Sequence, residues 1–230
     1  MQPPINAGTI LQNRYKIIKT LGQGGFGRTY LAEDQRRFNE LCAIKELIPT
    51  TAGASAWEKA QELFEREAAS LYQIEHPQVP KFRERFEQDQ RLFLVQDYVE
   101  GKTYYDLLEE RKSIGGSFTE AEVLRLIRSI LPVLGYIHTK GIIHRDISPD
   151  NIIMRESDKL PVLIDFGVVK ELRLKLQSKN ATPQTYVGKP GYSPSEQIQT
   201  GQAYPSSDLY ALAVSAIVLL TAKEPAELFD

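Results

Sequence analysis

The sequence predicts an α+β fold in two parts, a sheet with one helix followed by a mainly helical part. Residues 1–100 hold five short segments rich in Ile, Val, Tyr, Phe and Thr, as strands are. Between the third and the fourth, apolar residues recur about every 3.6 positions, which is the period of a helix. After residue 118 the apolar residues again recur mainly at helical spacing.

The first part contains the five predicted strands and one predicted helix over 57–71. Phe64, Ala68 and Leu71 lie on the apolar face of that helix. Glu67 shares this face, and a carboxylate placed there needs a partner. The strands are expected at 15–21, 28–34, 42–47, 81–87 and 92–99.

The second part begins with a clear helix start. Thr119 with Glu122 three residues later forms a capping box, which predicts a helix running to about Leu134. Leu124 and Leu131 are assigned to its apolar face, and Pro132 inside the pattern is expected to kink it.

The remaining segments are of three kinds. Residues 151–154 and 161–166 are short and apolar, and we expect them to form a hairpin. The stretch 167–206 is longer than a usual connection, which indicates a functional lid or partial disorder. Residues 208–222 are apolar on every side and predict a buried helix.

The composition excludes several classes of protein. With 42% hydrophobic and 25% charged residues, the 230-residue chain can bury a core. A formal net charge of −2 argues against a nucleic-acid partner. The single cysteine, Cys42, excludes a disulfide framework and fits a reducing compartment. No signal peptide is visible and the longest apolar stretch is too short to span a bilayer, so we expect a cytoplasmic protein without a membrane segment.

A glycine-rich segment follows the first predicted strand. Gly22, Gly24 and Gly27 have the spacing that lets backbone amides approach phosphates closely. Residues 28–31 continue as a strand, whereas a dinucleotide-binding loop opens a helix, so that class is excluded. The pattern predicts a strand–loop–strand flap over a nucleotide; a glycine turn without a ligand is the alternative.

Lys45 lies on the third predicted strand. Alternation places Ala43 and Lys45 on one face, opposite Cys42 and Ile44. A small residue beside a lysine suits a planar base and a phosphate. Pairing of Lys45 with Glu67 would provide the carboxylate's missing partner.

Two further motifs complete a set. His144-Arg145-Asp146-Ile147-Ser148-Pro149-Asp150-Asn151 follows the capped helix, and Asp165-Phe166-Gly167 comes after it. In this order, after the glycines, Lys45 and Glu67, the chain resembles eukaryotic-like Ser/Thr protein kinases of bacteria over residues 12–230. The resemblance implies a bilobal protein-kinase-like fold, with an N-lobe at 1–97 and a C-terminally truncated C-lobe at 98–230.

The resemblance also implies the roles of individual residues. The glycines would cover the ATP phosphates, and Lys45, oriented by Glu67, would hold two of them. Asp146 would accept the proton of the substrate hydroxyl, and Asn151 and Asp165 would bind Mg²⁺. Gln96 would be the gatekeeper of an adenine pocket formed with Leu21, Thr29, Ala43, Asp97, Val99 and Ile153.

Regulation is implied by Arg145 beside Asp146, because a guanidinium attracts a phosphate on the activation segment at 165–196. The candidate phosphorylation sites are Thr182, Thr185, Ser178 and Tyr186. His144 is expected to be a core residue, stacked with Leu71, Phe82 and Phe166.

The chain departs from the family pattern in three places. Ser148 stands where a lysine usually reaches the transferred phosphate, and Lys189 stands where a threonine is expected. We expect Lys189 to supply the missing charge. The third departure is Pro194-Ser195-Glu196, in which Glu196 keeps the expected carboxylate.

The family has further helices after the one containing Asp208, and one of their loops supplies an arginine to the Glu196 position. Without them, the apolar helix would expose part of its surface. We therefore expect a homodimer that covers it, or a disordered and inactive activation segment.

The leading hypothesis is an ATP- and Mg²⁺-dependent kinase that phosphorylates Ser/Thr of protein substrates. A nucleotide-binding regulatory module without activity is one alternative, favoured by Ser148, Lys189 and the truncation. A small-molecule phosphotransferase is another; the segment 188–196, which resembles a platform for a polypeptide, argues against it.

Overall fold

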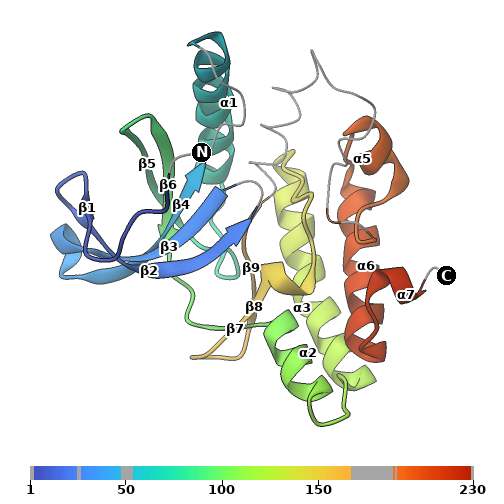
Figure 1. Cartoon of the computed structure of the whole chain (residues 1–230). Helices are drawn as coiled ribbons and strands as arrows, with labels where there is room; N and C mark the ends of the chain where they lie inside the picture. Colours follow the sequence, from blue (N-terminus) through green and yellow to red (C-terminus); the bar gives the residue numbers. More distant parts are fainter. Residues whose placement is uncertain (1–2, 25–26, 48–53, 167–188, 190, 229–230) are drawn as a thin grey trace. The chain divides into compact units, whose positions relative to one another are not determined.

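The computed structural model describes residues 3–24, 27–47, 54–166, 189 and 191–228. These residues form two compact units, shown in Figure 1. The first unit holds the described residues of 3–75 and 80–98, and the second holds those of 76–79 and 99–228. The short segment 76–79 joins the second unit, where the Gln78 carbonyl accepts from the Leu163 amide at 2.9 Å.

The first unit is built on an antiparallel sheet of order β1-β2-β3-β4-β6-β5. All five strands expected from the sequence are present, with ends that differ by a few residues. Among the described residues of this unit, the short β1 is added to them. The strands are β1 Ile10–Leu11, β2 Tyr15–Gly24, β3 Gly27–Asp34, β4 Glu40–Leu47, β5 Phe82–Gln88 and β6 Arg91–Asp97, with a 3-10 turn at Gln35–Arg37.

One face of this sheet carries the core of the unit. Strand alternation places Cys42 and Ile44 there, as expected. Lys45 and Ala43 lie on the opposite face and are half-buried. The core cluster consists of Leu11, Tyr15, Ile17, Tyr30, Ala32, Cys42, Ile44, Phe93 and Val95.

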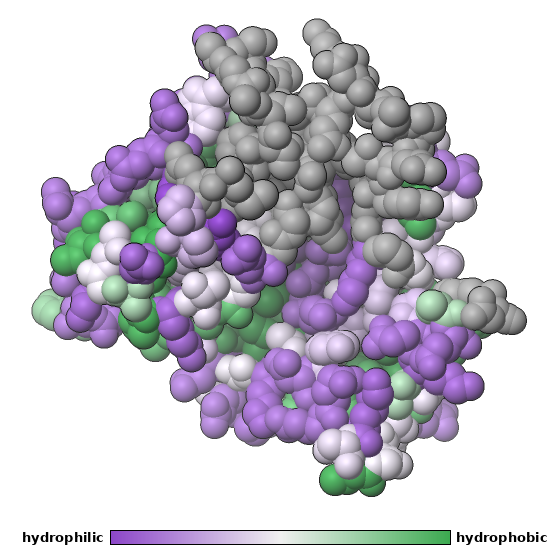
Figure 2. Space-filling model, in the orientation of Figure 1, coloured by the Kyte–Doolittle hydropathy of each residue, from purple (hydrophilic) through white to green (hydrophobic). Residues whose placement is uncertain are grey.

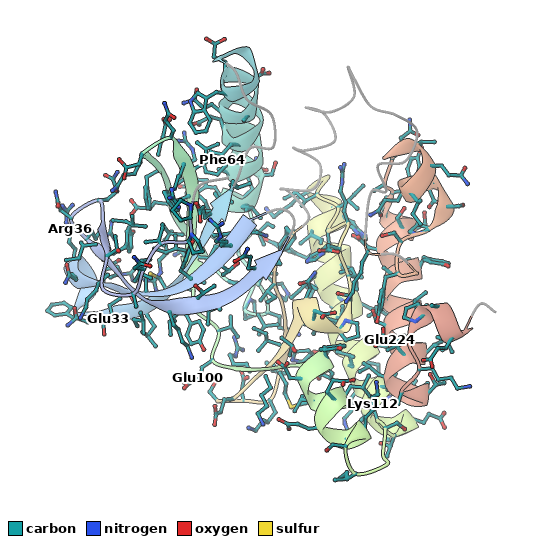
Figure 3. All side chains as sticks on the ribbon, in the orientation of Figure 1. Glu33, Arg36, Phe64, Glu100, Lys112 and Glu224 are labelled. Carbon is teal, nitrogen blue, oxygen red and sulfur yellow. The ribbon has the colours of Figure 1, made fainter. Side chains whose placement is uncertain are left out.

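Helix α1 (Ala54–Tyr72) contacts β5 and β6. Phe64, Ala68 and Leu71 are buried, as the helical spacing predicts. Figure 3 labels Phe64 on this helix. The Glu65 carboxylate pairs with the guanidinium of Arg85 on β5, which fixes the helix to the sheet edge. The side chain of Glu67 lies outside the described residues, so its pairing with Lys45 stays a prediction.

The second unit is mainly helical and includes a small antiparallel sheet of order β7-β8-β9. The hairpin expected between 151 and 166 is formed by β8 and β9. The elements are β7 Gly101–Thr103, α2 Tyr104–Lys112, α3 Glu120–Thr139, a 3-10 turn at Pro149–Asn151, β8 Ile152–Arg155, β9 Pro161–Leu163, α5 Ser195–Thr200, α6 Pro205–Thr221 and α7 Pro225–Leu228.

Helix α3 starts as the capping box predicts. The Glu122 amide donates to the Thr119 hydroxyl, and the Glu122 carboxylate accepts from the Thr119 amide at 2.8 Å. The helix continues through Pro132 to Thr139. Leu124 and Leu131 are 40% and 43% exposed, so their assignment to the apolar face was wrong. Its buried side is formed by Val123, Leu126, Ile130, Val133, Leu134 and Ile137.

Helix α6 packs against α3 but is not buried all round. Leu209, Tyr210, Ile217 and Leu220 are 38–45% exposed, which agrees with the expectation that this helix shows apolar surface. In Figure 2 the surface over α2 is by contrast mainly hydrophilic. Within the ranges that the structure describes, every helix is too short or too polar to cross a lipid bilayer.

Candidate functional site

The first unit carries the glycine segment as a hairpin between β2 and β3. Gly24 pairs with Gly27 at its end, so the predicted strand–loop–strand arrangement is confirmed. A Cβ on Gly27 would lie 2.1 Å from the Glu46 carbonyl oxygen, so packing requires this glycine. A Cβ on Gly22 would have no atom within 4 Å. Among the described residues, packing therefore does not explain Gly22, and its predicted contact with a ligand stays a prediction.

The strand register brings the other predicted nucleotide residues of this unit together. Thr29 lies opposite Lys45, and Ala43 lies opposite Gln96. Residues directly opposite in an antiparallel pair point to the same side of the sheet. All four are half-buried, which leaves part of each side chain accessible to a ligand. Leu21 lies on β2, toward the end of the strand that carries the glycines, and is 41% exposed.

The end of β6 is held by a charged side chain. The guanidinium of Arg83 donates through Nε to the Asp97 carboxylate at 2.6 Å, and Arg83 is only 5% exposed. The Asp97 amide donates to the Lys81 carbonyl at 2.9 Å. The predicted adenine-binding position is therefore fixed through both its side chain and its backbone. Cys42 lies on the core face, and burial raises the pKa of its thiol to about 12, so it is an inert core residue.

In the second unit, the segment 144–151 forms a compact loop. Asn151 donates through Nδ2 to the Asp146 carbonyl at 2.7 Å. This hydrogen bond uses the nitrogen of the Asn151 amide and not its oxygen. The Ile164 amide donates to the Asn151 carbonyl at 2.9 Å and so ties Asp165 to the same loop. The structure thus brings Asp146, Asn151 and the segment leading into Asp165 together.

Two residues of this region have left-handed backbones. Arg145 has φ 67° and Asp165 has φ 56°. Such values cost a residue with a side chain about 1–3 kcal/mol and persist only where surrounding contacts impose them. Both residues lie where the sequence predicts chemistry, whereas the chain's other left-handed residues, such as Asp89 and Gln90, lie in turns or at helix ends.

Asp208, at the start of α6, supplies the main anchor of the loop. Its carboxylate accepts from the backbone amides of His144 at 2.9 Å and Arg145 at 2.8 Å. It also contacts the His138 ring at 2.8 Å and is 1% exposed. Sequence reasoning missed this role. The signal was available, because a carboxylate opening the most apolar helix needs buried donors.

His144 is a neutral structural residue. Its Nε2 lies 2.9 Å from the Ile164 carbonyl and Nδ1 accepts from the Asp146 amide, which assigns the ring proton to Nε2. Burial lowers the pKa of this imidazole. The ring packs against Phe166 with centroids 4.5 Å apart, in agreement with a core role. The other two residues of the expected stack, Leu71 and Phe82, belong to the first unit.

Lys189 lies beside the loop. Its ammonium contacts the Asp150 carboxylate, and the Ser148 hydroxyl donates to the same carboxylate oxygen at 3.3 Å. The ammonium also lies 4.9 Å from the ring centre of Tyr192 and 5.8 Å from that of Tyr105. The two positions that depart from the family pattern thus meet at one oxygen atom.

Glu196, on α5, is hydrogen-bonded to the start of α6. Its carboxylate accepts from the Ser207 hydroxyl at 3.1 Å. The adjacent Gln197 donates to the Arg145 carbonyl at 2.8 Å, so α5 is joined to the loop that carries Asp146. Val99 and Ile153 are half-buried in this unit. The candidate phosphorylation sites Ser178, Thr182, Thr185 and Tyr186 lie outside the described residues.

The glycine hairpin and Lys45 in the first unit, and the loop of Asp146 and Asn151 with the following Asp165 in the second, are the elements that the family resemblance predicted. The protein kinase domain family matches residues 15–228, and the chain belongs to that family. The predicted bilobal α+β fold is confirmed by solved structures. The apo form of PpkA-294 is 29% identical with a TM-score of 0.78, covering 96% of this chain and 79% of that one. The PknI kinase domain of Mycobacterium tuberculosis is 26% identical with a TM-score of 0.70, covering 94% and 77%.

Curated relatives carry names of the same class. Serine/threonine-protein kinase PknA of Nostoc sp. strain PCC 7120 is 45% identical over 224 residues, which is 95% of this chain and 39% of the relative. Serine/threonine-protein kinase B of Synechocystis sp. strain PCC 6803 is 42% identical, covering 95% and 38%. The chain therefore spans about two fifths of the length of these relatives.

Proposed function

We propose that this chain transfers the γ-phosphoryl group of ATP to Ser or Thr hydroxyls of protein substrates. The observation that carries the proposal is the loop in which Asn151 is bonded to Asp146, tied to Asp165 and anchored by Asp208. The names of the relatives support a Ser/Thr acceptor. The first unit contributes the nucleotide contacts of the glycines and Lys45, and Glu67 is proposed to orient Lys45.

The transfer is a displacement at phosphorus. The acceptor oxygen forms a bond to the γ-phosphorus, the bond to the bridging oxygen breaks, and ADP leaves with the electron pair. The hydroxyl proton passes to the carboxylate of Asp146. The held loop makes this carboxylate a positioned base, which typically contributes 10²- to 10⁴-fold to a rate.

A divalent cation fits the oxygen donors of this region. Asn151 and Asp165 are proposed to hold it. The Asn151 amide nitrogen already donates a hydrogen bond to the Asp146 carbonyl, so the amide oxygen is the atom proposed to bind the cation. Within the described ranges no group of three or more His, Cys, Asp and Glu residues forms a cage. Mg²⁺ suits such a site, since it usually takes one or two protein ligands with phosphates and waters. When bound, it neutralises phosphate charge.

Lys189 is proposed to bring a positive charge to the transferred phosphate in place of the lysine absent at Ser148. Its contact with Asp150 supports this, because it fixes the ammonium beside the loop of Asp146. Electrostatic stabilisation of this kind is a large contribution to phosphoryl transfer. Arg145 is proposed to bind a phosphate on the activation segment.

The test is intact-mass analysis after incubation with ATP and Mg²⁺, with Asp146→Asn as the control. The acceptors are the chain itself, casein and an aminoglycoside. Phosphate on Ser or Thr of a protein, absent with Asp146→Asn, is the expected result. Phosphate on the aminoglycoside alone would establish a small-molecule phosphotransferase. ATP binding without transfer would establish the regulatory module.

Self-association is proposed from the exposed side chains of α6, Leu209, Ile217 and Leu220 among them. Sedimentation velocity over a range of concentrations tests it. A dimer that dissociates when Ile217 is changed to Lys is expected, and a monomer at all concentrations would contradict it.

A further inference from the structure

A buried charged cluster lies in the first unit, on the face of the sheet opposite Lys45. Glu46 and Arg28 form an ion pair at 3.3 Å and are 1% and 3% exposed. The other Glu46 oxygen lies 2.7 Å from the guanidinium of Arg91. The hydroxyl of Tyr30 donates to Glu46 at 2.7 Å. One carboxylate therefore joins β3, β4 and β6.

The segment before β1 closes this cluster. The amide of Ile5 donates to the Tyr30 hydroxyl at 3.2 Å, and Arg91 donates to the Pro3 carbonyl at 2.9 Å. Ile5 also packs against the core cluster of the sheet. Four segments of the chain therefore contribute to the cluster around Glu46: the residues before β1, and strands β3, β4 and β6.

On β3 and β4 the cluster is one residue away from the proposed nucleotide contacts. Glu46 follows Lys45 on β4, and Arg28 follows Gly27 on β3, directly opposite Glu46. The Glu46 carbonyl is also the atom that a side chain on Gly27 would strike. Any shift of Glu46 or Arg28 therefore moves the backbone of the glycine hairpin and of Lys45.

A buried ion pair is a poor way to gain stability, because apolar residues of similar volume often do as well or better. Its best-attested use is to fix one register against its alternatives. The backbone ladder sets the register of β3 and β4. A carboxylate bonded to three side chains restricts the twist and spacing of these strands further than an apolar pair would.

We propose that Glu46 is a positioning residue for nucleotide binding, acting by fixing β3 against β4 behind the glycine hairpin and Lys45. The inference rests on the proposed function, since it assumes that these elements bind ATP. Glu46 touches neither the nucleotide nor the acceptor. Its loss therefore raises the Kd and KM for ATP and leaves turnover at saturating ATP unchanged.

The test compares Glu46→Gln with Glu33→Gln, a matched change on the neighbouring strand β3 at a carboxylate that is 32% exposed and pairs with Lys16. ATP binding is measured by calorimetry with Mg²⁺, below the melting temperature of each variant. Glu46→Gln is expected to weaken binding about tenfold (~1.4 kcal/mol), and Glu33→Gln to leave it unchanged. Equal affinities would overturn the inference, whereas failure of the unmodified chain to bind ATP would instead refute the proposed function.

Two further variants keep the test decisive if Glu46→Gln does not fold. Tyr30→Phe removes only the hydroxyl that bonds Glu46 and Ile5, and it is expected to weaken ATP binding by a smaller factor. The triple variant Arg28→Met, Glu46→Leu and Arg91→Met, which replaces every charge of the cluster, is expected to regain stability but not affinity. Unchanged affinity of Tyr30→Phe, or recovery of affinity in the triple variant, would show a merely structural role.

Discussion

Removing the carboxylate of Asp208 is predicted to release the loop of Asp146. The carboxylate accepts from the amides of His144 and Arg145 at 2.9 and 2.8 Å and is 1% exposed, so water does not replace it. A buried N–H left unsatisfied costs about 1–3 kcal/mol. Asp208→Ala leaves two such groups, which gives a loss of about 2–6 kcal/mol. Asp208→Asn keeps one acceptor oxygen and should lose about 1–3 kcal/mol.

The free energy of unfolding is measured by urea denaturation followed by circular dichroism, and phosphate transfer is measured at a temperature where each variant is folded. Asp158→Asn is the control, because this carboxylate is 40% exposed and bonds to Arg155 at the surface. We expect both the free energy of unfolding and phosphate transfer to decrease in the order unmodified chain, Asp208→Asn, Asp208→Ala. A loss below about 1 kcal/mol for Asp208→Ala would refute the anchoring role, since a single lost donor already exceeds it.

Three further predictions concern other parts of the chain. Gly27→Ala should destabilise the fold, because its Cβ would meet the Glu46 carbonyl, whereas Gly22→Ala should leave stability unchanged and weaken ATP binding. The Arg111 guanidinium lowers the pKa of Glu122 from its ordinary value of 4.5 to about 2. This pair therefore stabilises the fold above about pH 4.5, and its contribution is lost as pH falls toward 2. In Glu122→Gln the free energy of unfolding should therefore fall less steeply over this pH range. Lys189→Met should lower turnover more than it raises the KM for ATP.

These predictions fail in distinct ways. Equal stability losses for the two glycine variants would remove the argument that Gly22 faces a ligand. An acid unfolding curve that is the same with and without Glu122 would refute the pairing with Arg111. Unchanged turnover of Lys189→Met would show that this ammonium does not act on the transferred phosphate.

The strands and the capped helix could be predicted from local patterns, because the spacing of apolar residues in each segment matches the side of the element that is buried in the fold. Alternation of Cys42, Ala43, Ile44 and Lys45 places the core residues on one side of β4 and Ala43 and Lys45 on the other, as the structure does. Helix α2 was missed because it is short and weakly amphipathic. Its signal was a capping box between Thr103 and an aspartate, where the usual pattern has Glu or Gln.

The buried charges could not be predicted, because their partners are distant in sequence. Glu46 depends on Arg28 and Arg91, and Asp208 binds amides more than sixty positions earlier. A sequence pattern shows that a charge lies on an apolar element but not which donors satisfy it. The family motifs found Asp146 and Asn151, whereas the residues that hold them became visible only in the folded chain.

We propose that residues of the first unit bind ATP and that Asp146 acts in the transfer step. This division of roles is tested most directly by measuring ATP affinity and phosphate transfer on Asp146→Asn and Lys45→Met side by side. Asp146→Asn should bind ATP with unchanged affinity and lose transfer by about a hundredfold or more. Lys45→Met should weaken ATP binding itself. Phosphate transfer by Asp146→Asn at the unmodified rate would contradict the account.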